Sequence, residues 1–108
     1  MDKASDLLRG HTDTVVLSIL VNNDNYGYEI KKHIIEKAGG DFELKEATLY
    51  SSYKRLEKSG HIKSYWGDET MGGRRRYYSI TDMGKKLLEK NKKEWKMTQI
   101  ILNKLLEV

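Results

Sequence analysis

Three consecutive arginines, Arg74–Arg76, lie in a segment, residues 71–79, that contains no acidic residue. Adjacent guanidinium groups repel one another unless an anion meets them, and phosphate is an anion that arginine binds through paired hydrogen bonds. Side-chain character alternates with a period of two over residues 62–66 and again over residues 74–80, which is the pattern of β-strands. The segment therefore predicts a basic β-hairpin that meets phosphate groups.

The residues before the hairpin predict a helix that begins at Glu46 and has two different sides. Leu49, Tyr53 and Leu56 fall on one side, which we expect to pack. The opposite side is small, hydroxylated and cationic, and such a surface suits a helix that lies in a DNA major groove. Alone, this surface would be interpreted as an ordinary solvated face, but the arginine hairpin directly after it favours DNA. The residues assigned to DNA contact are Ala47, Thr48, Tyr50, Ser51, Lys54, Arg55 and Lys58 in this helix and Gly73, Arg74 and Arg75 in the hairpin.

Two further helices are expected upstream. The first covers about residues 3–21 and contains Gly10. Either Gly10 permits close approach of another element, or the turns before it form a separate arm. The second covers about residues 26–38 and has an apolar stripe at four-residue spacing. Lys32 lies outside this stripe and is assigned to the DNA backbone, although an isolated lysine is more often only solvated. Helix, turn, helix and hairpin in this order predict a winged helix-turn-helix domain over residues 1–80.

The last segment, residues 81–108, predicts one long dimerisation helix. Thr81 is a good N-cap, and the helix is expected to run to about Glu107. One set of residues on it repeats at alternating steps of three and four, which is the spacing of a coiled-coil seam. The seam contains Leu88, Asn91, Trp95, Thr98, Leu102 and Leu105, and all of these except Asn91 are assigned to the dimer interface.

Trp95 makes the centre of this seam unusual. Asn91 and Thr98 lie one turn away on either side, and Gln99 lies beside them, where a tight zipper would have leucines. A large indole among short polar side chains leaves space, and its flat face can stack on a planar or cationic guest. The alternative is that Trp95 is only an anchor of the interface.

Composition narrows the classes of protein. The 108 residues allow one small domain, and twenty basic against sixteen acidic residues give a net charge of +4. There is no cysteine, and the three histidines fall in separate predicted elements without metal-ligand spacing, so neither a metal site nor an enzyme is indicated. No cofactor is expected. The longest apolar run is far shorter than a membrane span, so we expect no membrane partner and a cytoplasmic location.

Several ordered motifs resemble the PadR family of bacterial transcriptional repressors over nearly the whole chain. They are Leu8-Arg9-Gly10, Tyr26-Gly27-Tyr28-Glu29-Ile30, Ala47-Thr48-Leu49-Tyr50, Arg55-Leu56-Glu57 with Gly60, Gly72-Gly73-Arg74-Arg75, Tyr77-Tyr78, and Thr81 through Gly84. The run from Ser64 to Glu69 and the Glu94-Trp95 pair look most like its compact, LmrR-like subfamily of multidrug-sensing regulators.

The resemblance implies a mainly α-helical homodimer with a small β-hairpin that represses promoters and is induced by planar aromatic compounds. In the subfamily, the tryptophan that corresponds to Trp95 stacks such compounds at the dimer centre. The corresponding wall positions here are Leu7, Leu8, Thr14, Asn91 and Gln99. Two residues depart from the subfamily pattern: Gln99 replaces an acid, which weakens attraction for cationic drugs, and Lys45 replaces a better helix cap.

A two-fold dimer would present two reading helices to successive turns of the major groove. We therefore expect double-stranded DNA with a near-palindromic operator, whose half-sites are about 34 Å apart. The alternative function is a winged-helix module that binds acidic proteins and senses no ligand.

Overall fold

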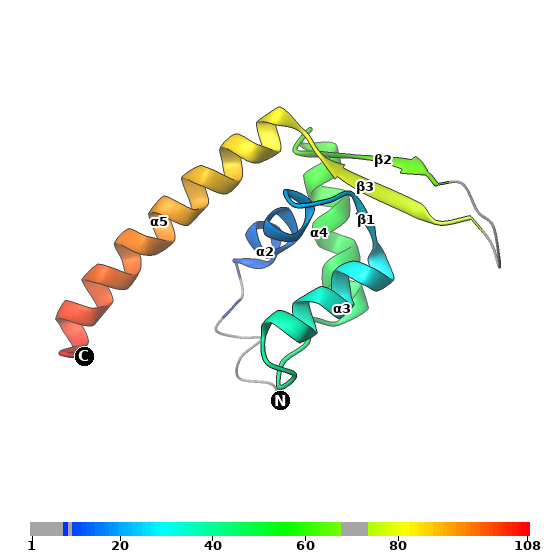
Figure 1. Cartoon of the computed structure of the whole chain (residues 1–108). Coiled ribbons are helices and arrows are strands. Elements are labelled where there is room, and N and C mark those ends of the chain that lie inside the picture. Colours follow the sequence, from blue (N-terminus) through cyan, green and yellow to red (C-terminus); the bar gives the residue numbers. More distant parts are fainter. Residues whose placement is uncertain (1–7, 9, 68–73) are drawn as a thin grey trace.

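The structure is a computed structural model that describes residues 8, 10–67 and 74–108. Three short helices pack beside a small antiparallel sheet, and the last helix and the hairpin extend from this unit in opposite directions (Figure 1). The elements are α2 (Thr12–Leu20), β1 (Asn25–Tyr26), α3 (Gly27–Lys37), α4 (Glu46–Lys58), β2 (Ile62–Trp66), β3 (Arg76–Ile80) and α5 (Asp82–Leu106). This order confirms the predicted mainly helical fold with a small hairpin and a long last helix.

One hydrophobic core joins the three short helices, the sheet and the first turns of α5. On α4, Leu49, Tyr53 and Leu56 are buried because steps of four and three residues place them on one side of a helix. The exposed side of α4 contains the small and cationic residues expected there. The other core residues are Val16, Leu17, Ile19, Leu20, Ile30, Ile34, Leu44, Ile62, Tyr78 and Leu88.

The first helix is shorter than predicted. It begins at Thr12 and not near residue 3, because Gly10 has a φ of +90°, outside the α-helical region. Glycine adopts positive φ without steric cost, so the chain can bend at Gly10 before the helix begins. A Cβ at Gly10 would meet no described atom within 4 Å, so no close approach requires this glycine. Apart from Leu8, the separate arm predicted before it lies outside the described residues.

The second helix also begins later than predicted, at Gly27, because the residues before it join the sheet. Asn25 and Tyr26 form β1, which pairs with Tyr78 and Tyr77 of β3. The sheet therefore has three strands, in the order β1-β3-β2. The rings of Tyr26 and Tyr77 meet edge to face, with centroids 5.4 Å apart, and such aromatic cross-strand pairs stabilise a short strand.

Helix α5 begins with the predicted cap. The backbone N–H of Gly84 donates to the Thr81 hydroxyl over 3.1 Å, and a Cβ at Gly84 would lie 2.1 Å from the His61 carbonyl oxygen. Glycine thus allows α5 to start tightly against β2. Leu88 is only 2% exposed, and from Lys92 onward every residue of the helix is exposed. The division into residues 1–80 and 81–108 stays a prediction, but the first turns of α5 share the core of the preceding unit.

Candidate nucleic-acid interface

The outer side of α4 presents short hydroxyl groups and cations to solvent. Helix packing through Leu49 and its partners turns these residues outward. Lys54 is held over the ring of Tyr50, with 5.5 Å between the ammonium nitrogen and the ring centroid, a cation–π arrangement that orders both side chains. All of the following predicted contact residues are exposed: Ala47, Thr48, Tyr50, Ser51, Lys54 and Lys58.

Arg55 is arranged differently from the other candidates on α4. Its Nη2 atom lies 2.6 Å from Oδ1 of Asp13, and its Nε atom lies 3.3 Å from Oδ2 of the same carboxylate. This hydrogen bond from Arg55 to Asp13 raises the pKa of the guanidinium. Ser52 donates to Asp13 as well, over 2.6 Å. Arg55 therefore joins α4 to α2, and its role in DNA contact stays a prediction.

The three arginines of the hairpin divide into two groups. Arg76 donates to the Ser64 hydroxyl over 2.7 Å and lies 3.4 Å from a carboxylate oxygen of Glu57. Arg74 lies over the ring of Trp66, 5.1 Å from its centroid, and Arg75 lies 4.9 Å from the centroid of another ring, that of Tyr26. Within residues 8, 10–67 and 74–108, neither Arg74 nor Arg75 has an acidic partner, so both can meet an outside anion. Gly73 lies outside the described residues.

Two stacked tyrosines hold the outer part of the hairpin, next to the last described pair, Trp66 with Arg76. The rings of Tyr65 and Tyr77 stack with centroids 5.7 Å apart. The Tyr65 hydroxyl donates to Asp24 over 2.6 Å, and this bond raises the pKa of Tyr65 to about 12. The hairpin is thereby tied to the segment before β1. No local sequence pattern reveals this role for either residue.

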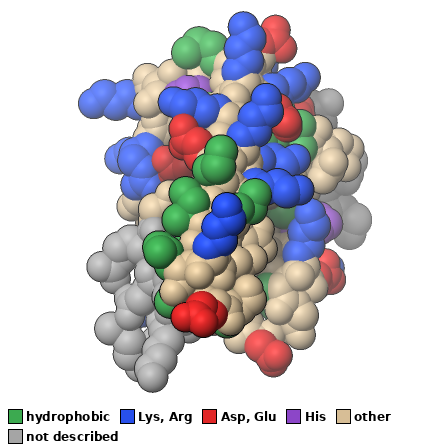
Figure 2. Space-filling model, turned by 90° about the vertical axis from the view of Figure 1, so that its left-hand side faces the viewer, with side chains coloured by type: hydrophobic (Ala, Val, Ile, Leu, Met, Phe, Trp, Pro, Cys, Tyr) green, Lys and Arg blue, Asp and Glu red, His purple; other side chains and the backbone are tan. Residues whose placement is uncertain are grey.

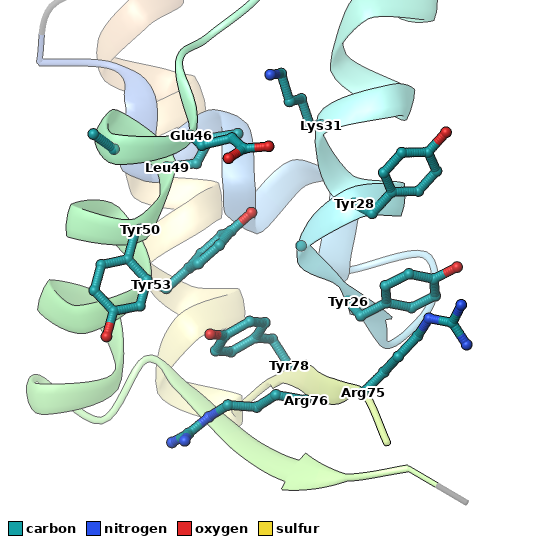
Figure 3. A pocket seen from close by; sticks show the side chains of 12 residues that line it. Tyr26, Tyr28, Lys31, Glu46, Leu49, Tyr50, Tyr53, Arg75, Arg76 and Tyr78 are labelled. Carbon is teal, nitrogen blue, oxygen red and sulfur yellow. The ribbon is translucent and has the colours of Figure 1, made fainter. Parts of the chain in front are cut away.

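A cleft of about 600 Å³ lies between α3, α4 and β3. Residues from all three elements line it, among them Ala47 of α4. Tyr50 and Arg75 lie on different sides of it (Figure 3). The reading side of α4 and the hairpin arginines thus border one and the same depression. Lys32, a predicted contact on α3, is exposed and does not line the cleft, whereas Lys31 does.

The predicted ligand residues gather where α2 meets α5. The Asn91 amide donates to the Thr14 hydroxyl over 2.8 Å. The ring of His11, which the sequence analysis did not assign, lies edge-on to Trp95 with centroids 5.4 Å apart. Trp95 is 49% exposed. Of the remaining candidates, Leu8 is half-buried, Gln99 is exposed and Leu7 lies outside the described residues.

Apolar side chains extend from Trp95 to the end of α5. Figure 2 shows them in the lower part of this side of the molecule, with lysines and arginines mostly above. Leu88 lies in the core of the chain itself, so the surface open to a second copy begins after it. The exposed large apolar residues are Trp95, Met97, Ile100, Ile101, Leu102, Leu105, Leu106 and Val108; Thr98 is exposed among them.

Comparison with known proteins identifies the family. Residues 16–90 match the profile of the transcriptional regulator PadR-like family. The chain belongs to this family. An uncharacterized protein of Lysinibacillus sphaericus is 43% identical over 95% of this chain and 94% of its own. Because PadR proteins are transcriptional regulators, the prediction that the chain is not an enzyme is confirmed.

Solved PadR-like structures share the fold over nearly the full length. A transcriptional regulator of Clostridium thermocellum is 49% identical, with a TM-score of 0.85 over 93% of this chain and 94% of that chain. A PadR family regulator of Clostridium difficile is 42% identical, with a TM-score of 0.79 over 89% and 98%. Bacillus subtilis PadR in complex with operator DNA is 24% identical, with a TM-score of 0.64 over 72% and 44%, and shares the fold.

In the part of the chain that the structure describes, no helix combines the length and apolarity that crossing a membrane requires.

Proposed function

We propose that this PadR-family regulator is a homodimeric repressor that binds a specific DNA sequence through α4 and the hairpin. The single observation that carries the proposal is the shared cleft: Ala47 and Tyr50 of α4 border it together with Arg75 of the hairpin. A duplex that lies against one of these surfaces also reaches the other. The complex of Bacillus subtilis PadR with operator DNA supports the same use of the fold.

The two surfaces have different tasks. In the major groove, the hydroxyl groups of Thr48, Tyr50 and Ser51 and the ammonium of Lys54 read base edges. Lys58 and the hairpin arginines Arg74 and Arg75 bind phosphates, which supply most of the affinity but little sequence information.

Dimerisation through α5 brings two copies of α4 together on one DNA duplex. Leu102 and Leu105 are 43% and 71% exposed, and they continue an apolar surface of the kind that marks a protein interface. From Lys92 onward every residue of α5 is exposed in the described part of the chain, and a second copy buries this half of the helix in a two-fold arrangement. The operator is then near-palindromic, with half-sites about 34 Å apart.

The dimer centre takes a planar aromatic inducer. The Trp95 ring is half exposed and carries only one aromatic contact, from His11, among the described residues. A flat molecule between the two Trp95 rings changes the angle between the α5 helices, and with it the separation of the α4 helices. By linkage, the inducer binds the DNA-bound dimer more weakly by the factor by which it weakens DNA binding.

A titration of the protein against duplex DNA at two salt concentrations tests the proposal. The duplexes are an operator selected from a random-sequence library and an unselected random duplex. Lys58→Ala is expected to weaken operator binding and to reduce the slope of log affinity against log salt by about 0.9, the value of one phosphate contact. Weak binding without salt dependence to both duplexes would instead favour a module that binds protein.

A further inference from the structure

The cleft between α3, α4 and β3 contains side chains to which the proposed function gives no task. Lys31 projects from α3 toward α4 (Figure 3), and Tyr28 of the same helix also lines the cleft. Tyr28 is 72% exposed. The side chain of Lys31 is 27% exposed, and its recorded acidic partner, Glu43, lies 3.9 Å away, at the limit of an ion pair. Both groups are therefore available to a molecule that enters the cleft.

The walls of the cleft favour an anion that also has apolar surface. Arg75 lies beside the ring of Tyr26, at the start of the helix that carries Lys31. The N-cap residue of α3, Tyr26, forms no side-chain cap, so backbone N–H groups at this helix end lack side-chain partners. The buried Tyr53 hydroxyl, which has no hydrogen-bond partner among the described residues, points into the gap between α4 and α3 (Figure 3). Glu46 is the one acidic residue in the described lining.

The position of the cleft indicates that its anion is a phosphate of the DNA backbone. The reading side of α4 and the hairpin lie on either side of it, so a duplex that contacts both must carry one strand across the mouth between them. A sugar–phosphate backbone offers phosphates for the cations and an apolar sugar face for the tyrosine rings.

We propose that the cleft is a phosphate seat that receives the backbone of one operator strand, with Lys31 and Arg75 on separate phosphates of that strand and Tyr28 beside it. The proposal rests on the proposed function and extends it to α3. It also assigns the contact on α3 to Lys31 in place of Lys32, which is exposed and lies outside the cleft. The two lysines are adjacent, so each serves as a matched control for the other.

The test compares Lys31→Ala and Lys32→Ala in binding the selected operator duplex. Affinity changes with salt concentration to the power of about −0.9 per phosphate contact, so loss of one contact weakens binding about eightfold at ~0.1 M salt. We expect this loss, with a slope reduced by about 0.9, for Lys31→Ala but not for Lys32→Ala, and recovery in Lys31→Arg. Equal effects of the two alanine variants, or no effect of Lys31→Ala, would overturn the seat.

Neutralising the acidic residue of the cleft provides a second test. Removing the only acid of the described lining with Glu46→Gln is expected to strengthen operator binding, because a phosphate is repelled by a carboxylate. Weaker binding by this variant would mean that the cleft holds a cation, and the seat would be rejected.

Neutral methylphosphonate linkages, placed one at a time along the operator, locate the contact. At one position in each half-site, the substitution should weaken wild-type binding while leaving Lys31→Ala unchanged, since the two changes remove the same interaction. Equal losses in both proteins at every position would count against the seat. If the methylphosphonate pattern is not seen while Lys54→Ala and Arg74→Ala still weaken operator binding, only the phosphate seat is rejected. If Lys31→Ala, Lys54→Ala and Arg74→Ala all leave operator binding unchanged, the proposed function is rejected.

Discussion

The guanidinium of Arg55 and the carboxylate of Asp13 form two hydrogen bonds, of 2.6 and 3.3 Å, that join the proposed reading helix α4 to α2. The next residue of α2, Thr14, accepts a hydrogen bond from Asn91 of α5. Adjacent residues of one short helix thus contact α4 on one side and α5 on the other. In the proposed dimer, a movement of α5 would reach α4 through α2.

Asp13→Ala should destabilise the protein more than Arg55→Ala. The aspartate variant leaves the Ser52 hydroxyl, which is fully buried, without its acceptor, and an unpaired buried polar group costs about 1–3 kcal/mol. The Arg55 side chain is more than half exposed, and ion pairs of this kind contribute about 0.2–1 kcal/mol. Urea unfolding at one fixed protein concentration measures both. A larger loss for Arg55→Ala would show that Asp13 is not the centre of this network.

Arg74 and Arg76 should respond differently to substitution by alanine. Arg76 is bound to Ser64 and Glu57, so its loss is expected to lower the free energy of unfolding by up to about 1 kcal/mol and to change the salt slope less. Arg74 has no acidic partner among the described residues, so its loss should leave stability unchanged and reduce the salt slope of operator binding by about 0.9. Unfolding curves and operator-binding curves of Arg74→Ala and Arg76→Ala distinguish a structural role from a phosphate contact. The reverse pattern would place the phosphate contact at Arg76.

These two networks show what local sequence patterns reveal and what they omit. The packed side of α4 follows from the spacing of Leu49, Tyr53 and Leu56, and the start of α5 follows from Thr81, because both signals lie within one element. Asp13 and Arg55 are 42 residues apart, and Arg76 is 19 residues from Glu57. No periodicity links such pairs, so the sequence alone could not separate Arg55 from Arg74 and Arg75 as a DNA contact. The strand β1 is likewise created by its partner β3 and not by its own two residues.

Alkaline pH should weaken the attachment of the hairpin at Tyr65. The hydrogen bond to Asp24 raises the pKa of Tyr65 from 10.0 to about 12. The native state therefore retains the phenol proton more strongly than the unfolded state. Stability from this bond is fully present below pH 10 and is lost as the pH rises toward about 12. The difference in unfolding midpoint between wild type and Tyr65→Phe should shrink over that interval.

The measurement is a series of urea unfolding curves between about pH 8 and 12. Tyr28→Phe is the matched control, because Tyr28 is an exposed tyrosine of the same domain. Burial raises the pKa of Tyr53 and of Tyr78, but both residues are present in all three proteins and cancel in the comparison. A constant difference between wild type and Tyr65→Phe up to pH 12 would contradict the prediction.

Leu102→Asp should convert the dimer to monomers. The side chain lies in the exposed apolar surface of α5, and a charge buried there against a second copy has no partner to offset its desolvation. Lys93→Asp is the control, because Lys93 lies on the opposite side of the helix from the seam. Sedimentation equilibrium distinguishes the two species, and operator affinity should fall with the loss of the dimer. Leu102→Asp protein that stays dimeric would place the interface elsewhere.

Trp95, and not Trp66, should report a planar guest at the dimer centre. The chain has two tryptophans: Trp66 lies beneath arginines of the hairpin, whereas Trp95 lies on α5 next to His11. A tricyclic dye such as acridine orange that stacks on an indole quenches its emission. We therefore expect quenching in wild type and in Trp66→Phe but not in Trp95→Phe, which retains the emission of Trp66.

Operator binding should be intact in Trp95→Phe, because Trp95 lies far along α5 from the hairpin. Dye that binds to DNA directly can also release the operator from the protein. Any release of operator that persists with Trp95→Phe measures this direct effect on DNA. Quenching of equal size in Trp95→Phe would assign the dye site to the hairpin and remove the central pocket.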